Sequence, residues 1–249
     1  MKGASGAKID LRGDYVYKLC GDAEEQVRWF NLARGLGVTD GVRLPAVTPV
    51  APVAYNMEFI RGHLATAESS VMFLEVCIRQ IDIWANTPPA SDGDWASYLC
   101  RLREHVSICP TEEMGKALEL FEAADPFPSS FCHGDFTLEN ILIESDGTCA
   151  LIDPNFKTGL FQSYILDLGK LLQSTHAHYH TIFGSNDGVD LSRHGAWLKH
   201  RLEDWGLWEQ SLLACISHIM RLRKYRPEEQ RPLVDALLKE LTGEYERTL

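Results

Sequence analysis

The stretch HGDFTLEN at residues 133–140, followed by LID at residues 151–153, decides how the rest of the chain is interpreted. It contains Asp135, then Asn140 five residues later, and Asp153 thirteen residues after that. Transfer of a phosphoryl group from a magnesium nucleotide needs these side chains. One carboxylate receives or orients the proton of the acceptor hydroxyl, and a carboxylate and an amide hold the metal. The pattern therefore points to phosphoryl-transfer chemistry.

The residues between Asn140 and Asp153 predict a β-hairpin. ILI at residues 141–143 is a short apolar run, ESDG at residues 144–147 contains an Asp-Gly turn pair, and residues 148–152 form a second apolar run. Such a hairpin would carry Asn140 at its start and Asp153 at its end, and so bring both to one mouth. The alternative is an ordinary hairpin with polar residues at its turns.

With these motifs the chain resembles the protein-kinase-like fold, and within it the aminoglycoside phosphotransferase and choline kinase group of small-molecule kinases. The resemblance implies that Asp135 is the catalytic base, that Asn140 and Asp153 bind Mg²⁺, and that His133 braces the catalytic loop. Gly134 stands where protein kinases usually carry Arg, which is similar to the small-molecule branch.

The segment DLGK at residues 167–170 is similar to one in which a family Asp supports the catalytic loop, although Asp167 could also be a simple helix N-cap. Asp153 is followed by Pro154-Asn155 rather than Phe-Gly. The interval from Asp153 to Asp167 is short and lacks an Ala-Pro-Glu sequence, whereas a protein kinase needs a long segment here to dock a peptide. A small-molecule acceptor is therefore favoured over a protein acceptor.

The fold class expected is α+β, a two-lobed kinase-like fold with a small β-rich N-lobe at residues 1–62 and a larger helical C-lobe at residues 63–249. Gly3, Ser5 and Gly6 form a compact glycine-containing turn that could let backbone amides approach phosphates. In the strand predicted at residues 15–19, Lys18 lies on an apolar face and needs an anionic partner. The resemblance implies that it contacts the inner phosphates. A solvated edge lysine is the alternative, and Lys8, in turn-like surroundings, is the rival candidate.

A helix is expected from Asp22 to Gly35 or Gly37, with Asp22 as N-cap and Glu25 completing a capping box. The resemblance implies a different role, in which Glu25 pairs with Lys18. Residues 55–60 predict a strand similar to the hinge between lobes. Backbone groups of Glu58, Phe59 and Ile60 would contact the base of the nucleotide there. No side chain in this segment distinguishes ATP from GTP.

Beyond the hinge, hydrophobic spacing predicts a series of helices. Before the hairpin they cover residues 68–84, 94–106 and 112–124. After it they cover residues 164–183, 191–204, 208–225 and 227–246, the last with Pro227 in its first turn.

The composition, 45% hydrophobic and 24% charged with a net charge of −11, is that of an ordinary globular protein. The negative charge argues against general nucleic-acid binding, which needs a basic surface. The sequence has no run of eighteen apolar residues, no apolar signal-peptide core, and seven scattered cysteines. A reduced cytoplasmic protein without a membrane partner is expected, and its oligomeric state is open.

Two further patterns carry alternatives. His176, His178 and His180 alternate, and on a helix His176 and His180 would lie one turn apart and could bind a metal, but a solvated or groove-lining face is the preferred interpretation. A basic run of four residues either matches the dipole at a helix end or contacts an anionic substrate or partner; it consists of Arg221, Arg223, Lys224 and Arg226.

The sequence thus predicts an ATP- or GTP-dependent, Mg²⁺-requiring phosphotransferase acting on a hydroxyl of a small molecule such as a sugar, an aminoglycoside or a choline-like compound. Two alternatives remain: a nucleotide-binding regulatory module resembling a pseudokinase, and a compact protein kinase.

Overall fold

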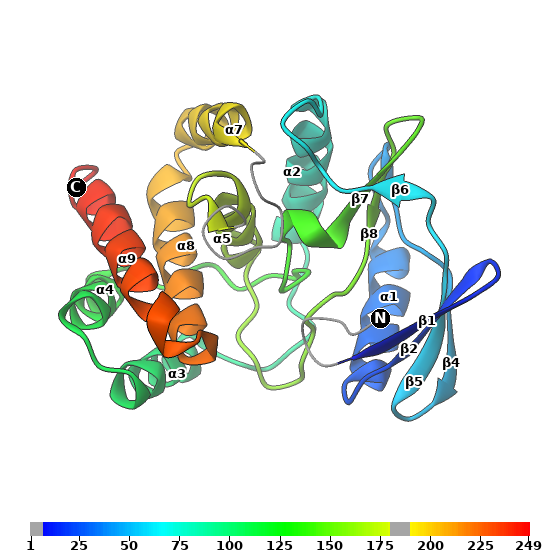
Figure 1. Ribbon diagram of the computed structural model, residues 1–249, viewed down its shortest axis with the longest axis horizontal. Coiled ribbons are helices and arrows are strands. Elements are labelled where there is room, and N and C mark those ends of the chain that lie inside the picture. The colour runs from blue at the N-terminus through cyan, green and yellow to red at the C-terminus, as the bar shows by residue number, and fades with distance from the viewer. Residues whose placement is uncertain (1–6, 180–189) are drawn as a thin grey trace.

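A computed structural model describes residues 7–179 and 190–249. A β-rich N-terminal part stands at the right of Figure 1, and a larger helical part fills the centre and left. This arrangement confirms the α+β, two-part architecture expected from the sequence. The predicted phosphate-covering residues Gly3, Ser5 and Gly6 lie outside the described residues, as does His180. The exact boundary at residue 62 stays a prediction.

The first sheet is antiparallel and has the strand order β1-β2-β5-β4. Its strands are β1 (Lys8–Arg12), β2 (Tyr15–Leu19), β4 (Val47–Ala51) and β5 (Ala54–Glu58). The expected strands at residues 15–19 and 55–60 are present, the second ending at Glu58. The turn-like assignment of Lys8 was wrong, because this residue begins β1 and lies opposite Leu19 of β2. Pro49 sits on edge strand β4, where a missing N–H is tolerated.

The second sheet contains the predicted hairpin. Its order is β3-β8-β7-β6, formed by β3 (Val42–Arg43), β6 (Gly62–His63), β7 (Ile141–Glu144) and β8 (Cys149–Leu151). The amide of Ile152 donates to the carbonyl of Asn140 at 3.0 Å and closes the mouth of the hairpin. The hairpin prediction is therefore confirmed, and Asn140 and Asp153 are brought to one end of it.

Helix α1 (Ala23–Leu36) packs against β4 and β5. The other helices are α2 (Met72–Ala85), α3 (Trp95–Ile108), α4 (Glu112–Ala123), α5 (Tyr164–Thr175), α7 (Ser192–Asp204), α8 (Trp208–Leu222) and α9 (Arg231–Glu246). Helix α5 ends at Thr175, earlier than predicted. Helix α9 begins at Arg231, because a 3-10 turn, Glu228–Gln230, separates it from Pro227.

Helices α5 and α8 stand side by side at the centre of the helical part (Figure 1). A methyl group added at Gly169 would lie 2.6 Å from the Cβ of Ala214, so the absence of a side chain permits this close approach. The pairing matters for the site because α5 supports the loop at residues 133–140, as described below. In residues 7–179 and 190–249, no helix is both long and apolar enough to cross a bilayer.

An aromatic cluster joins α1 to the start of this loop. The indole of Trp29 is fully buried, stacks on Phe131 with ring centroids 5.9 Å apart, and meets Trp84 edge-on at 5.7 Å. Its Nε1 donates to the carbonyl of Cys132 at 2.8 Å. A directional hydrogen bond inside a packed cluster fixes the position of α1 relative to the loop.

Candidate active site

Asp167 anchors the loop at residues 133–140. Its carboxylate is fully buried and accepts two backbone hydrogen bonds, from His133 N at 2.6 Å and from Gly134 N at 2.8 Å. Burial raises its pKa to about 7, although both amide donors favour the ionised form. The cap of α5 is Ser163, whose hydroxyl accepts from Ile165 N. Asp167 therefore ties the loop to α5 and does not cap the helix.

Gly134 is required by the shape of this loop. Its φ of 80° lies in the left-handed region, and an added Cβ would be 2.4 Å from the carbonyl oxygen of Asn155. The amide of Asn155 in turn donates to His133 O at 3.0 Å, so the loop and the segment after Asp153 are in direct contact. Only glycine combines this conformation with so close an approach.

Replacing Gly134 with alanine should destabilise the protein by about 2–3 kcal/mol, because backbone strain and the clash with Asn155 add together. Displacement of the adjacent Asp135 should also lower turnover. Thermal unfolding and steady-state kinetics measure the two effects. Gly147→Ala is the matched control, since Gly147 has a φ of 88° but open space where its Cβ would lie. If both variants lost the same unfolding free energy and the same turnover, the close contact with Asn155 would not explain the requirement for glycine at position 134.

Asp135 is held on both carboxylate oxygens. Lys170 Nζ lies 3.1 Å from Oδ1, and Asn140 Nδ2 donates to Oδ2 at 3.0 Å and to the Asp135 carbonyl at 2.8 Å. Burial would raise the pKa of this carboxyl, but Lys170 and Asn140 outweigh it and lower the pKa. Asp135 is consequently ionised near neutral pH and fixed in one orientation.

Lys18 faces Asp153 across the cleft. Its side chain is 4% exposed, and its Nζ donates to Asp153 Oδ1 at 2.7 Å and to Gln26 Oε1 at 3.1 Å. Gln26 Oε1 also accepts from the buried hydroxyl of Tyr55 at 2.6 Å. Lys18 is therefore a buried, paired cation and not a solvated edge lysine.

The pairing predicted between Lys18 and Glu25 is wrong. Glu25 accepts from the amide of Thr158 at 3.4 Å, and Gln26 occupies the position on α1 that faces the lysine. The capping box is absent as well, because Asp22 accepts from the Gln26 side chain and makes no cap hydrogen bond. Adjacent helix residues point about 100° apart, so an error of one position moves the side chain out of the cleft.

These groups border one cleft of about 400 Å³. Its walls come from β1, β2, α1, the 133–140 loop and the segment after the hairpin, and they include Ile9, Lys18, Gln26, Asp135, Glu139, Asn140, Asp153, Asn155, Lys157 and Tyr225. The structure thus brings together Asp135, Asn140, Asp153 and Lys18. Lys170 and Gln26 were not predicted; the position of Lys170 one turn after Asp167 on α5 is the signal that could have identified it.

The predicted base-binding segment lies at the end of β5. The amide of Glu58 donates to Ala46 O at 2.8 Å and that of Phe59 to Asp14 O at 2.9 Å, while the Glu58 carboxylate pairs with Arg43. Two of the three predicted amide donors are therefore engaged within the N-terminal part. The carbonyl groups of this segment remain the proposed contacts for a base.

His133 lies behind the loop, 1% exposed, with its ring edge-on to Trp29 at 5.0 Å and to Phe136 at 5.4 Å. Burial lowers its pKa to about 4, although the nearby charges of Asp135 and Asp153 oppose the shift. The neutral ring therefore acts as a packing wedge that supports the loop from within the aromatic cluster.

The buried, neutral His133 should by itself make the folded protein less stable on mild acidification. The unfolded chain protonates His133 near pH 6.5, while the folded protein excludes this proton until about pH 4. This one residue makes the unfolding free energy fall by about 1.4 kcal/mol per pH unit between those values. Asp167 acts in the opposite sense below pH 7, since only the folded state binds its proton there. Urea unfolding at pH 7, 6 and 5 compares wild type with His133→Phe, in which the contribution of Asp167 is retained. The unfolding free energy of the variant should rise relative to that of wild type as the pH falls; an equal pH dependence of the two proteins would contradict the assignment to His133.

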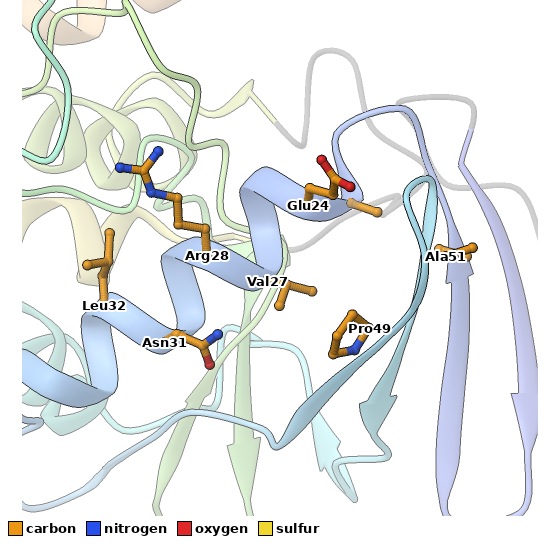
Figure 2. Close-up of a pocket in the computed structure, with 9 residues that line it drawn as sticks. Glu24, Val27, Arg28, Asn31, Leu32, Pro49 and Ala51 are labelled. Atoms are coloured by element: carbon orange, nitrogen blue, oxygen red, sulfur yellow. The ribbon is translucent and has the colours of Figure 1, made fainter.

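The structure contains a second groove of about 400 Å³ on the other side of α1 (Figure 2). Val27 and Asn31 of α1 point toward Pro49 of β4 across it, and Leu32 and Ala51 also border it. This groove includes none of the carboxylates of the cleft. His176 lies apart from the cleft carboxylates and pairs with Glu244 at 2.8 Å. Across the described residues, no cluster of three or more His, Cys, Asp or Glu could hold a metal.

Comparisons with known proteins bear on the family and the fold of the chain. The family model described as "Phosphotransferase enzyme family" matches residues 12–178. No curated protein sequence matches the chain significantly.

Among solved structures, aminoglycoside phosphotransferase APH(4)-Ia in ternary complex with AMP-PNP and hygromycin B is 12% identical, with a TM-score of 0.65 over 98% of this chain and 91% of that one. The gentamicin complex of APH(2")-IIa is 12% identical, with a TM-score of 0.64 over 96% and 89% of the two chains. A putative fructosamine-3-kinase from Thermobifida fusca is 16% identical, with a TM-score of 0.58 over 95% of both. At these identities the structures establish a shared kinase-like fold. Because the family model spans most of the chain, including the loop, the hairpin and α5, this protein belongs to the phosphotransferase enzyme family.

Proposed function

We propose that this protein transfers the γ-phosphoryl group of ATP or GTP to a hydroxyl group of a small molecule. The observation that carries the proposal is the cleft in which an ionised, doubly held Asp135 stands opposite the Lys18–Asp153 pair. One wall offers a carboxylate to an acceptor hydroxyl, and the other offers a buried cation to phosphates. Structural neighbours named as complexes with AMP-PNP, hygromycin B and gentamicin support the same substrate classes.

The residues present fit a nucleotide-bound Mg²⁺. This ion is commonly held by one or two protein oxygens together with phosphate oxygens and water. Asp153, whose side chain is 34% exposed, and Asn140 both border the cleft and supply such oxygens. When bound, Mg²⁺ would neutralise charge on the phosphates. A triad of protein carboxylates is not needed for this role.

In the proposed mechanism, Lys18 binds the inner phosphates and Gln26 holds the ammonium group in place. Asp135 orients the acceptor hydroxyl toward the γ-phosphorus and accepts its proton late, as the loose transition state collapses. The lowered pKa of Asp135 keeps its carboxylate ionised near neutral pH and makes it a weak base. A weak base suits a mechanism in which the proton is transferred late. Lys170 keeps the carboxylate in position, and Asp167 and Gly134 keep the loop in position.

A small acceptor is also supported by the segment that follows Asp153. It runs directly into α5, which begins at Tyr164, and it contacts the loop through Asn155. A docking platform for a peptide would need a longer segment. Sugars, aminoglycosides and choline-like alcohols are the acceptor classes proposed from the family.

The test is nucleotide turnover with defined acceptors. Release of ADP from Mg-ATP and of GDP from Mg-GTP is measured with hexoses, aminoglycosides, choline, ethanolamine and nucleosides, with Asp135→Asn as control. Acceptor-dependent release that disappears in the variant supports the proposal. Lys18 contacts Gln26 on α1 and not the glutamate that the family resemblance implied. This difference favours the alternative in which the protein is a nucleotide-binding regulatory module. Mg-nucleotide binding without release above the variant, for every acceptor tested, would favour that alternative.

A further inference from the structure

A small cavity lies beside the loop, on the side facing α3 and α8. Its volume is about 40 Å³, and it is bordered by Gly134 of the loop, Asn155 and Lys157 of the following segment, Arg101 of α3, and His218 and Arg221 of α8. A cavity of 10–15 Å³ holds one water molecule, so this one accepts a group of a few heavy atoms.

The cavity lies next to the proposed active site. Asn155 and Lys157 border both it and the 400 Å³ cleft, and Gly134 is the immediate neighbour of Asp135. Consecutive Cα atoms are 3.8 Å apart. The cavity and the Asp135 carboxylate therefore belong to neighbouring residues of the loop.

Two arginines meet at this cavity without a carboxylate partner. Within the described ranges 7–179 and 190–249, neither guanidinium has a carboxylate within 4.0 Å, whereas the neighbouring Arg103 and Arg223 pair with Glu122 and Asp235. Burial lowers the pKa of Arg101, and the charge of Arg221 lowers it further. Arg221 ends α8, where a cation suits the helix dipole, but Arg101 lies inside α3 and has no such reason to be there.

His218 adds an unused acceptor to the same wall. It is 3% exposed, and its Nε2 lies 2.9 Å from the carbonyl of Leu166, which can only accept, so Nε2 carries the proton. Its Nδ1 is then a bare lone pair, buried and without a partner among the residues that the structure describes. Two half-buried cations without a counter-charge are costly, and an anionic ligand that binds between them lowers the free energy of the site. A buried acceptor such as Nδ1 is likewise costly while it has no donor.

We infer that the acceptor carries an oxyanion, a carboxylate or phosphate group, that binds between Arg101 and Arg221 while its hydroxyl reaches Asp135. This inference rests on the proposed function and favours hydroxy acids, hydroxy amino acids or sugar phosphates over the neutral and cationic acceptors proposed from the family. The two sources of the oxyanion are separated by the test.

The test uses three matched acceptors: glycerol, glycerate and glycerol 3-phosphate. Wild-type protein should turn over at least one anionic member with a kcat/KM well above that of glycerol. Loss of a charge-assisted hydrogen bond in Arg101→Gln should raise KM for that member by about 10-fold or more, with little change for glycerol. Arg101→Lys should recover part of the loss. Arg103→Gln, on the same helix but exposed and paired with Glu122, should behave as wild type.

Calorimetric titration of glycerate and glycerol 3-phosphate, with the nonhydrolysable nucleotide present, gives a readout that does not require turnover. Binding that weakens in Arg101→Gln and not in Arg103→Gln supports the oxyanion site even if no acceptor is phosphorylated, in which case only the proposed function fails. Turnover of neutral acceptors, with anion binding and KM insensitive to Arg101, would overturn the inference and leave the proposed function intact. If glycerate binds more tightly than glycerol 3-phosphate, the oxyanion of the acceptor is a carboxylate; if glycerol 3-phosphate binds more tightly, it is a phosphate.

Discussion

Asp135→Asn should lower the rate of phosphoryl transfer by about 10³-fold, the loss expected when a general base is removed. The asparagine has one acceptor oxygen, whereas Lys170 and Asn140 each donate to a separate oxygen of Asp135. The variant therefore loses both the proton acceptor and one of the two contacts that orient it. Lys18 and Asp153, on the opposite wall, are unchanged, so Mg-nucleotide affinity should stay close to that of wild type.

The measurement is single-turnover transfer with an active acceptor, together with nucleotide titration of the same samples. Asp146→Asn is the control, because Asp146 lies in the exposed turn of the hairpin. Lys170→Met provides a second readout. Removing this cation should raise the pKa of Asp135 and move the acid limb of the pH–rate profile to higher pH. Turnover of Asp135→Asn at the wild-type rate would refute the assignment of the base.

Asp153→Asn should abolish productive Mg-nucleotide binding, lowering affinity by about 100-fold through loss of a metal-binding carboxylate. Asp153 has a φ of 54°, a left-handed conformation that asparagine tolerates better than most residues. The substitution thus tests the charge and leaves the backbone in place. Lys18 then keeps its charge in a buried site without a carboxylate. The resulting destabilisation should be about 2 kcal/mol, less than for a fully buried pair because Asp153 is partly exposed.

A double-mutant cycle separates the two effects. Lys18→Met combined with Asp153→Asn removes both charges, so its unfolding free energy should recover relative to Asp153→Asn alone. Nucleotide binding should not recover, because both the phosphate cation and the metal carboxylate are missing. Urea unfolding and nucleotide titration measure the two quantities. Recovery of nucleotide binding in the double variant would remove Asp153 from the metal site.

The parts of the site that could be predicted are those whose spacing is local. The Asp-Gly turn between two apolar runs predicted the hairpin, and the hairpin predicted that Asn140 and Asp153 lie close together. Asp167 was identified at a distance from the loop only because a resemblance linked the two. Strand β1 was missed because four of its five residues are exposed, so its strand conformation comes from pairing with β2 and not from an apolar pattern.

The error on α1 has a similar cause. Hydrophobic spacing in this helix predicts one apolar side with Trp29, Leu32, Ala33 and Leu36, and Glu25 lies one turn before Trp29 on that side. In the structure the buried face contains Gln26, Trp29, Phe30 and Ala33, while Leu36 is exposed. Leu32 borders the groove of Figure 2. Two apolar faces on one helix cannot be ranked from periodicity alone, because only the tertiary contacts decide which of them faces the cleft.

The contact between Lys18 and Asp153 has a consequence for how the two ligands arrive. With these two groups joined at 2.7 Å and Gln26 uncharged, the charge of the Asp153 carboxylate is already balanced by Lys18 before any ligand binds. A free divalent ion would have to compete with the ammonium group for the carboxylate. Phosphates that draw Lys18 away release this carboxylate for the ion, so each ligand should strengthen the binding of the other, by the same factor in both directions. The empty protein should therefore be a poor sensor of magnesium alone, and loading should be a concerted event set by the concentration of the nucleotide complex.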